Sequence, residues 1–181
     1  MTARYRAPAI ALHWLMAAGL IGTFALGVYM HELPFSPDKL RLYSWHKWAG
    51  VTLFMLALMR LAWRAGHRPP ELPAAMSPLM RRAAAWVHAA LYLLMLAIPL
   101  SGWLMSSAKG VTTVWFGVLP LPDLLGKDKA LGDCLLEVHQ TLNFTLLALV
   151  IGHTGAALKH HLIDRDDVLT RMLPWRKGGP R

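Results

Sequence analysis

Five histidines lie inside or at the edges of long apolar stretches of this chain, and they are its most informative residues. An ionisable side chain costs at least a few kcal/mol to bury in hydrocarbon, so each of them is a functional candidate. Imidazole is the commonest metal ligand in proteins. The single cysteine, Cys134, excludes disulfides, cysteine-ligated iron–sulfur clusters and covalent C-x-x-C-H haem attachment within the chain. The five histidines are His13, His46, His88, His139 and His153.

Two of these histidines share one predicted helix. His139 and His153 are 14 residues apart. On an α-helix this spacing is about 21 Å of rise, and it returns to within about 40° of the same face. One helix would therefore present two imidazoles to the same partners at two different depths.

Four apolar stretches must position these side chains. The 181 residues are 55% hydrophobic and only 16% charged, whereas soluble domains carry about 25% charged residues. The apolar stretches cover about residues 8–30, 45–63, 83–105 and 135–158, and a helix of about 20 apolar residues crosses a bilayer. We predict an all-α integral membrane four-helix bundle, one transmembrane domain over residues 1–181, surrounded by membrane lipid.

The distribution of charge predicts the orientation of the bundle. Thirteen of the 19 Lys and Arg residues lie in the N-terminal tail, the 60–82 loop and the C-terminal tail, which together carry a net charge of +9. The remaining loops sum to zero. The positive-inside rule places both termini in the cytoplasm. Because the basic residues flank apolar spans and form no separate basic domain, nucleic-acid binding is excluded. The apolar 109–131 loop, broken by Pro and Gly, is expected to lie in the outer interface.

With this orientation, the histidines pair by depth. His46 and His139 both lie near the outer face, whereas His13 and His153 both lie near the inner face. Two bis-imidazole sites stacked across the membrane follow. Zinc usually takes three or four protein ligands, while a b-type haem needs two axial imidazoles and a flat slot between facing helices. Haem is therefore favoured, as two haem b groups, and the small residues expected to open the slots are Gly19, Gly50, Gly152 and Gly155.

The remaining candidates have more than one interpretation. His88 lies at the inner depth, where it either replaces His13 as a ligand or lines a pocket beside the inner haem. His160 and His161 follow the last span, either as interfacial polar residues or as part of a quinone site. Cations that suit haem propionates, and equally suit ordinary snorkelling at the interfaces, are Arg60, Arg64 and Lys47.

Several motifs carry a family resemblance over nearly the whole chain. They are LHWL around His13, WHKWAG around His46, WVHAALYLLMLAIPLSG around His88, VHQTL, IGHTGAALKHH and the closing DVLTRMLP. With them the chain resembles the bacterial cytochromes b561, small di-haem membrane proteins related to the cytochrome b subunit of nickel–iron hydrogenases. The resemblance implies a multi-pass protein of the bacterial inner membrane. It carries the axial-ligand role, with each imidazole bound to haem iron, onto His13, His46, His139 and His153.

The resemblance also implies an activity. Small stand-alone members are similar to superoxide oxidase, an oxidoreductase that takes electrons from superoxide at the outer face and reduces ubiquinone near the inner haem. His88, with His160 or His161, would then line the quinone pocket. The lysines that would steer the superoxide anion are Lys109, Lys127 and Lys129.

Two other functions compete with this one. A non-catalytic cytochrome b subunit would pass electrons between a partner dehydrogenase and the quinone pool. Its redox partner would then be a protein instead of superoxide. A histidine-lined metal carrier would need polar residues along a path between the two histidine layers. The spans are too apolar there, so the carrier is disfavoured.

Overall fold

The computed structural model describes residues 4–73 and 76–174 and contains four long helices. These are α1 (Ala7–Glu32), α2 (Pro37–Gly66), α3 (Pro78–Ala108) and α4 (Lys129–Leu162). All four are long and apolar enough to cross a membrane. A short 3₁₀ helix, η1 (Thr170–Met172), follows α4. The predicted all-α, four-helix membrane fold is confirmed.

Each helix is longer than the apolar stretch that marked it in the sequence. The α2 helix begins at Pro37, eight residues before the predicted span, because the Ser36 hydroxyl accepts the backbone N–H of Lys39 at 3.2 Å. The Ser77 hydroxyl caps α3 in the same way, and the Asp128 carboxylate caps α4. Such caps satisfy the free N–H groups at a helix start. Hydropathy marks only the part of a helix that lies in hydrocarbon, so the capped ends were not predicted.

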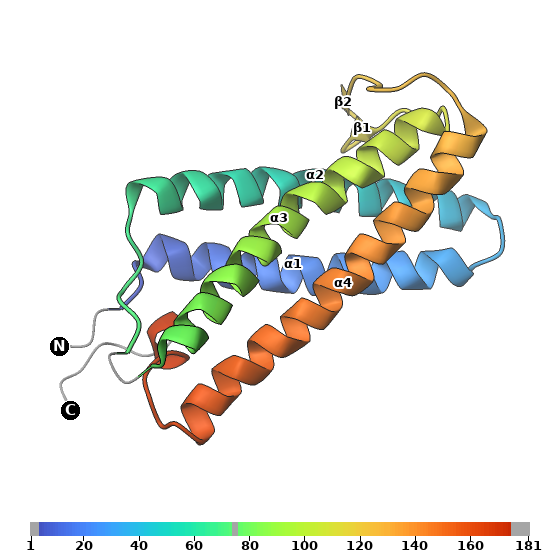
Figure 1. Ribbon diagram of the computed structural model, residues 1–181. Helices are drawn as coiled ribbons and strands as arrows, with labels where there is room; N and C mark the ends of the chain where they lie inside the picture. Colours follow the sequence, from blue (N-terminus) through green and yellow to red (C-terminus); the bar gives the residue numbers. More distant parts are fainter. Residues whose placement is uncertain (1–3, 74–75, 175–181) are drawn as a thin grey trace.

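The helices form two antiparallel pairs that cross one another (Figure 1). The first pair is α1 with α2, and the second is α3 with α4; α3 also packs on α2. A small core of Leu94, Ile98 and Leu146 joins α3 to α4. We call one end of the bundle the terminal end, where α1 and α3 begin and α2 and α4 finish. The opposite end is the hairpin end.

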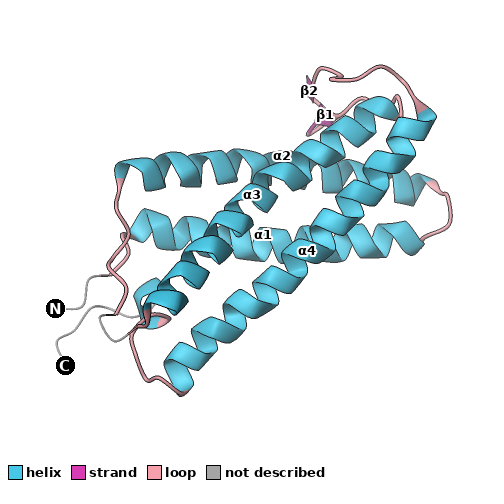
Figure 2. Ribbon diagram, viewed as in Figure 1, coloured by secondary structure: helices cyan, strands magenta, loops and turns pink. Residues whose placement is uncertain are grey.

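The hairpin end takes its name from a two-stranded hairpin between α3 and α4 (Figure 2). Strand β1 (Val114–Trp115) pairs antiparallel with β2 (Leu119–Pro120). The indole N–H of Trp48 donates to the Val114 carbonyl at 2.7 Å, and the indole N–H of Trp103 donates to the Pro122 carbonyl at 3.0 Å. The loop was expected to cover the outer end of the bundle, but its strands were not foreseen.

Large apolar side chains cover the outside of the bundle. Ile21, Leu93 and Ile151, from three different helices, are 66%, 66% and 64% exposed. A soluble protein rarely exposes apolar surface on this scale, whereas a lipid-facing surface requires it. The chain is a multi-pass membrane protein.

Candidate functional site

The hairpin-end histidine pair consists of His46 on α2 and His139 on α4. Their ring centres are 6.3 Å apart, with an angle of 80° between the ring planes. The Nδ1 atom of His139 lies 3.1 Å from the Ile98 carbonyl oxygen and 3.0 Å from the Ser101 hydroxyl, both on α3. The Ser101 hydroxyl itself donates to Ile98 at 2.8 Å. Donation from Nδ1–H to this carbonyl leaves Nε2 of His139 free to bind a metal, as in many metal-ligating histidines.

Two glycines allow these imidazoles to approach neighbouring helices closely. A Cβ atom on Gly27 would lie 3.1 Å from Cε1 of His46, and one on Gly102 would lie 3.1 Å from Cε1 of His139. The Nδ1 atom of His46 is buried, and no described side chain or backbone group forms a hydrogen bond of normal geometry with it. At Gly27 and at Gly102, a residue with a Cβ atom would force the neighbouring ring to shift by a few tenths of an ångström.

The sequence pointed to other glycines. Gly19 faces the Leu53 side chain. At Gly50, Gly152 and Gly155, an added Cβ atom would meet no atom of another described side chain within 4 Å. None of these four packs on a histidine ring, and their role in opening the haem slots stays a prediction. Gly27 and Gly102 were missed because the contact between a glycine and a histidine of another helix leaves no pattern in the sequence.

The terminal-end histidine pair consists of His13 on α1 and His153 on α4. Their ring centres are 6.4 Å apart, with 66° between the ring planes. His88 on α3 lies nearer, with its ring centre 5.3 Å from that of His153. The guanidinium of Arg60 lies 3.3 Å from Nδ1 of His13. Three histidines from three helices therefore meet at this end.

The spacing within each pair suits one metal ion held between two imidazoles. A metal–imidazole nitrogen bond is about 2.0 Å long, so two rings on opposite sides of one iron have centres about 6 Å apart. Both pairs have this spacing, whereas the 5.3 Å between His88 and His153 is short for it. Of the two roles left open for His88, the distance favours a place beside the pair.

The donor set also fits haem better than a zinc site. Among the described residues, a cluster of three metal-ligating side chains occurs only at His160, Asp164 and Asp166. Neither histidine pair is part of such a cluster. Two imidazoles without a third protein ligand match the axial coordination of a haem, while zinc needs at least three protein ligands.

The cations predicted for propionates divide between the two ends of the bundle. Arg60 lies beside the terminal-end pair, where its Nε–H donates to the Tyr92 hydroxyl at 3.1 Å. Arg64 lies over the same tyrosine ring, 5.6 Å from its centre. Lys47 lies at the hairpin end and donates to the Val111 carbonyl at 3.1 Å. Arg60 is thus the cation in direct contact with a paired histidine.

Two of the three predicted steering lysines, Lys109 and Lys129, pair with one carboxylate at the hairpin end. Lys129 and Lys109 approach Asp133 at 2.6 Å and 3.4 Å. The aliphatic part of Lys127 lies against the Gly110 backbone, 3.0 Å from where a Cβ would be. Lys109 and Lys129 therefore come together at Asp133, whose negative charge offsets part of their positive charge.

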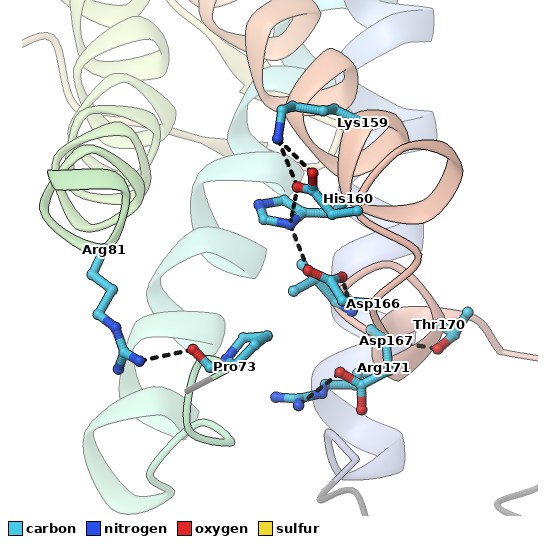
Figure 3. A network of polar contacts seen from close by, with 10 residues as sticks. Pro73, Arg81, Lys159, His160, Asp166, Asp167, Thr170 and Arg171 are labelled. Carbon is cyan, nitrogen blue, oxygen red and sulfur yellow. Dashed lines mark hydrogen bonds and ion pairs between the residues drawn. The ribbon is translucent and has the colours of Figure 1, made fainter. Parts of the chain in front are cut away.

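The neighbouring histidines at the end of α4 have different surroundings. His160 is buried, and its Nδ1 lies 2.7 Å from the Asp166 carboxylate (Figure 3). His161 is exposed. The sequence alone could not show which of the two histidines contacts a carboxylate, because Asp166 lies beyond the end of α4.

Comparisons with known proteins show which family the chain resembles over its length. The family model for prokaryotic cytochrome b561 matches residues 4–175. The chain is 39% identical to cytochrome b561 homolog 2 of Escherichia coli K12, over 94% of this chain and 91% of that protein. It is 30% identical to cytochrome b561 homolog 1 of the same organism, over 96% and 99%. It is 26% identical to the probable superoxide oxidase CybB of Yersinia pestis, over 98% and 100%.

Proposed function

The chain belongs to the prokaryotic cytochrome b561 family of membrane electron-transfer proteins that bind haem b, and we propose that it holds two haems in series across the bacterial inner membrane. His46 and His139 would hold the haem at the hairpin end, and His13 and His153 would hold the haem at the terminal end. The observation that carries this proposal is the pairing itself: two imidazole pairs with ring centres 6.3 Å and 6.4 Å apart.

The surroundings of the pairs support this assignment. The Ile98 carbonyl and Ser101 hydroxyl contact Nδ1 of His139, so Nε2 would be the nitrogen available to hold the iron. If His13 held iron through Nε2, its Nδ1 would carry a proton and could not accept a hydrogen bond from Arg60. A propionate is the natural new partner for that guanidinium. When bound, the haems supply one-electron transfer between the two ends of the bundle.

We place the terminal end in the cytoplasm and the hairpin end in the periplasm. The support is the net charge of +9 on the N-terminal tail, the 60–82 loop and the C-terminal tail, against zero on the other loops. Electrons then enter at the hairpin end and leave at the terminal end, where His88 lies beside His153 and where His160 and His161 end α4. Of these last two, the buried His160 is our candidate for the quinone site, and His161 is exposed.

We propose superoxide as the donor and ubiquinone as the acceptor. Two superoxide anions each lose one electron to become dioxygen, and one ubiquinone takes up both electrons and two protons to become ubiquinol. The resemblance to a probable superoxide oxidase supports this reaction. The cluster of Lys109, Lys127 and Lys129 offers positive charge on the periplasmic side.

A second candidate is a cytochrome b subunit that passes electrons between a partner dehydrogenase and the quinone pool. One observation favours it: Asp133 offsets two of the three steering lysines. The more similar relatives, at 39% and 30% identity, are described only as cytochrome b561 homologs.

Two measurements on the purified full-length protein test the proposal. A pyridine haemochrome assay should give two haem b per chain. In stopped-flow spectroscopy, superoxide should reduce the haems and ubiquinone should then reoxidise them. One haem per chain would refute the paired-ligand assignment. If superoxide leaves the haems oxidised while a co-purifying dehydrogenase reduces them, the second candidate replaces the first.

A further inference from the structure

His160 is the one ionisable side chain that is buried among the described residues, at 9% exposure. It lies in the last turn of α4, between the exposed residues Lys159 and His161. A buried imidazole requires hydrogen-bonding partners. Those partners determine which ring nitrogen carries the proton and which ring nitrogen remains free to contact a ligand.

One ring nitrogen of His160 is held by a carboxylate. Its Nδ1 lies 2.7 Å from Oδ2 of Asp166. The other oxygen of Asp166 accepts the Val168 N–H at 3.0 Å, and the backbone N–H of Asp166 donates to the His160 carbonyl, also at 3.0 Å. Three hydrogen bonds therefore fix Asp166 against the imidazole (Figure 3).

The second carboxylate near His160 is already engaged. Asp164 lies 3.2 Å from Nδ1 of His160, but Nζ of Lys159 is 2.8 Å and 2.7 Å from its two oxygens. The lysine neutralises Asp164 and occupies the place that a metal ion would need on it. The cluster of His160, Asp164 and Asp166 is therefore better suited to holding a proton than a divalent cation.

Asp166 belongs to a segment that is anchored to other parts of the terminal end. Arg171 pairs with Asp167 at 2.7 Å and also donates to the Glu71 carbonyl between α2 and α3. The indole N–H of Trp14 on α1 donates to the Met172 carbonyl at 2.8 Å. These contacts keep the segment after α4 against the bundle, so the carboxylate that holds His160 has a defined position.

We infer that Asp166 is a positioning residue that orients His160 as a proton donor to the quinone. With Nδ1–H bonded to the carboxylate, Nε2 is the nitrogen left to face a ligand. As ubiquinone gains its two electrons, protonated His160 gives the Nε2 proton to a quinone oxygen and becomes neutral. Water at the exposed face of the segment returns that proton. The inference rests on the proposed quinone reduction at this end.

The test compares two isosteric variants of the full-length haem-loaded protein, Asp166→Asn and Asp164→Asn. In Asp166→Asn, haem reduction by superoxide should be unchanged, whereas reoxidation by ubiquinone should slow about 10-fold or more, within the range ascribed to general acid catalysis. Asp166→Glu should recover part of this rate. Asp164→Asn should stay within about twofold of the wild type, because Asp164 is already paired with Lys159.

A second readout does not depend on turnover. Nitrogen-15 NMR of histidine-labelled protein, with His160 assigned from a His160→Gln sample, should show the Nδ1–H form in the wild type and its loss in Asp166→Asn. An unchanged tautomer together with an unchanged reoxidation rate in Asp166→Asn would overturn the inference. A wild-type protein whose haems ubiquinone cannot reoxidise would instead refute the proposed function, and the proton-donor role with it.

Discussion

The Nδ1 atom of His139 lies 3.1 Å from the carbonyl oxygen of Ile98, across the contact between α4 and α3. The carbonyl accepts a second hydrogen bond from Ser101, whose hydroxyl also lies 3.0 Å from the same ring nitrogen. An orienting partner of this kind fixes the tautomer and the direction of a metal-ligating imidazole. The haem site that we propose at the hairpin end would therefore be organised by α3 as much as by the helices that carry its two histidines.

Replacing Ser101 by Ala should weaken the outer site without abolishing it. Loss of an outer-sphere hydrogen bond typically costs about 10-fold or more in metal affinity. Haem retention during dilution, followed by absorption, should fall for one of the two haems. The control is Ser106→Ala, because Ser106 is equally buried on α3 but donates to Val111, away from His139. Equal haem loss in both variants would argue against an orienting role for Ser101.

Replacing one histidine of a pair should remove or destabilise only that pair's haem. The two pairs share α4, where 14 residues separate His139 from His153 by about 21 Å. His139→Ala or His46→Ala should leave one low-spin haem with the spectrum of the inner site, and His13→Ala or His153→Ala should leave the outer one. Haemochrome assays and low-temperature spectra measure this. Two low-spin haems in all four variants would refute the assignment.

The helices and the paired histidines could be predicted because both depend on local signals. A run of apolar residues marks a membrane span, and the 14-residue spacing on α4 follows from helix geometry alone. Depth along the membrane then matched His46 with His139 and His13 with His153, and the structure brings each pair together.

The contacts that surround the pairs could not be predicted, because they join residues that are distant in sequence. The hydrogen bond between Ile98 and His139 spans 41 positions, and the approach of Gly27 to His46 depends on how α1 packs on α2. The choice between His160 and His161 depends on where the chain turns after α4. The periodicity of side chains along the sequence does not predict such packing.

Replacing Asp133 by Asn should speed haem reduction by superoxide. Asp133 lies between Lys109 and Lys129, and removing its charge leaves both cations free to attract an anion. One unit charge about 10 Å away is worth about 0.4 kcal/mol in water, or about a twofold change in rate. Stopped-flow measurements at low ionic strength should show this gain.

Added salt should abolish the effect of Asp133→Asn, because charges are screened over about 8 to 10 Å at physiological ionic strength. Lys109→Gln and Lys129→Gln should change the rate in the opposite direction under the same conditions. Rates that do not respond to any of these substitutions or to salt would count against superoxide steering at this surface.

Replacing His88 by Gln should separate the two half-reactions. The 5.3 Å between the ring centres of His88 and His153 is short for two imidazoles on one iron, so His88 should not be an axial ligand. The variant should keep two haems and normal reduction by superoxide, while reoxidation by ubiquinone slows about 10-fold. His161→Gln is the matched control, since His161 is exposed at the same end of the bundle and should leave both rates within about twofold. Loss of one haem in His88→Gln would instead identify His88 as a haem ligand, with His13 lying beside the haem and not bound to it.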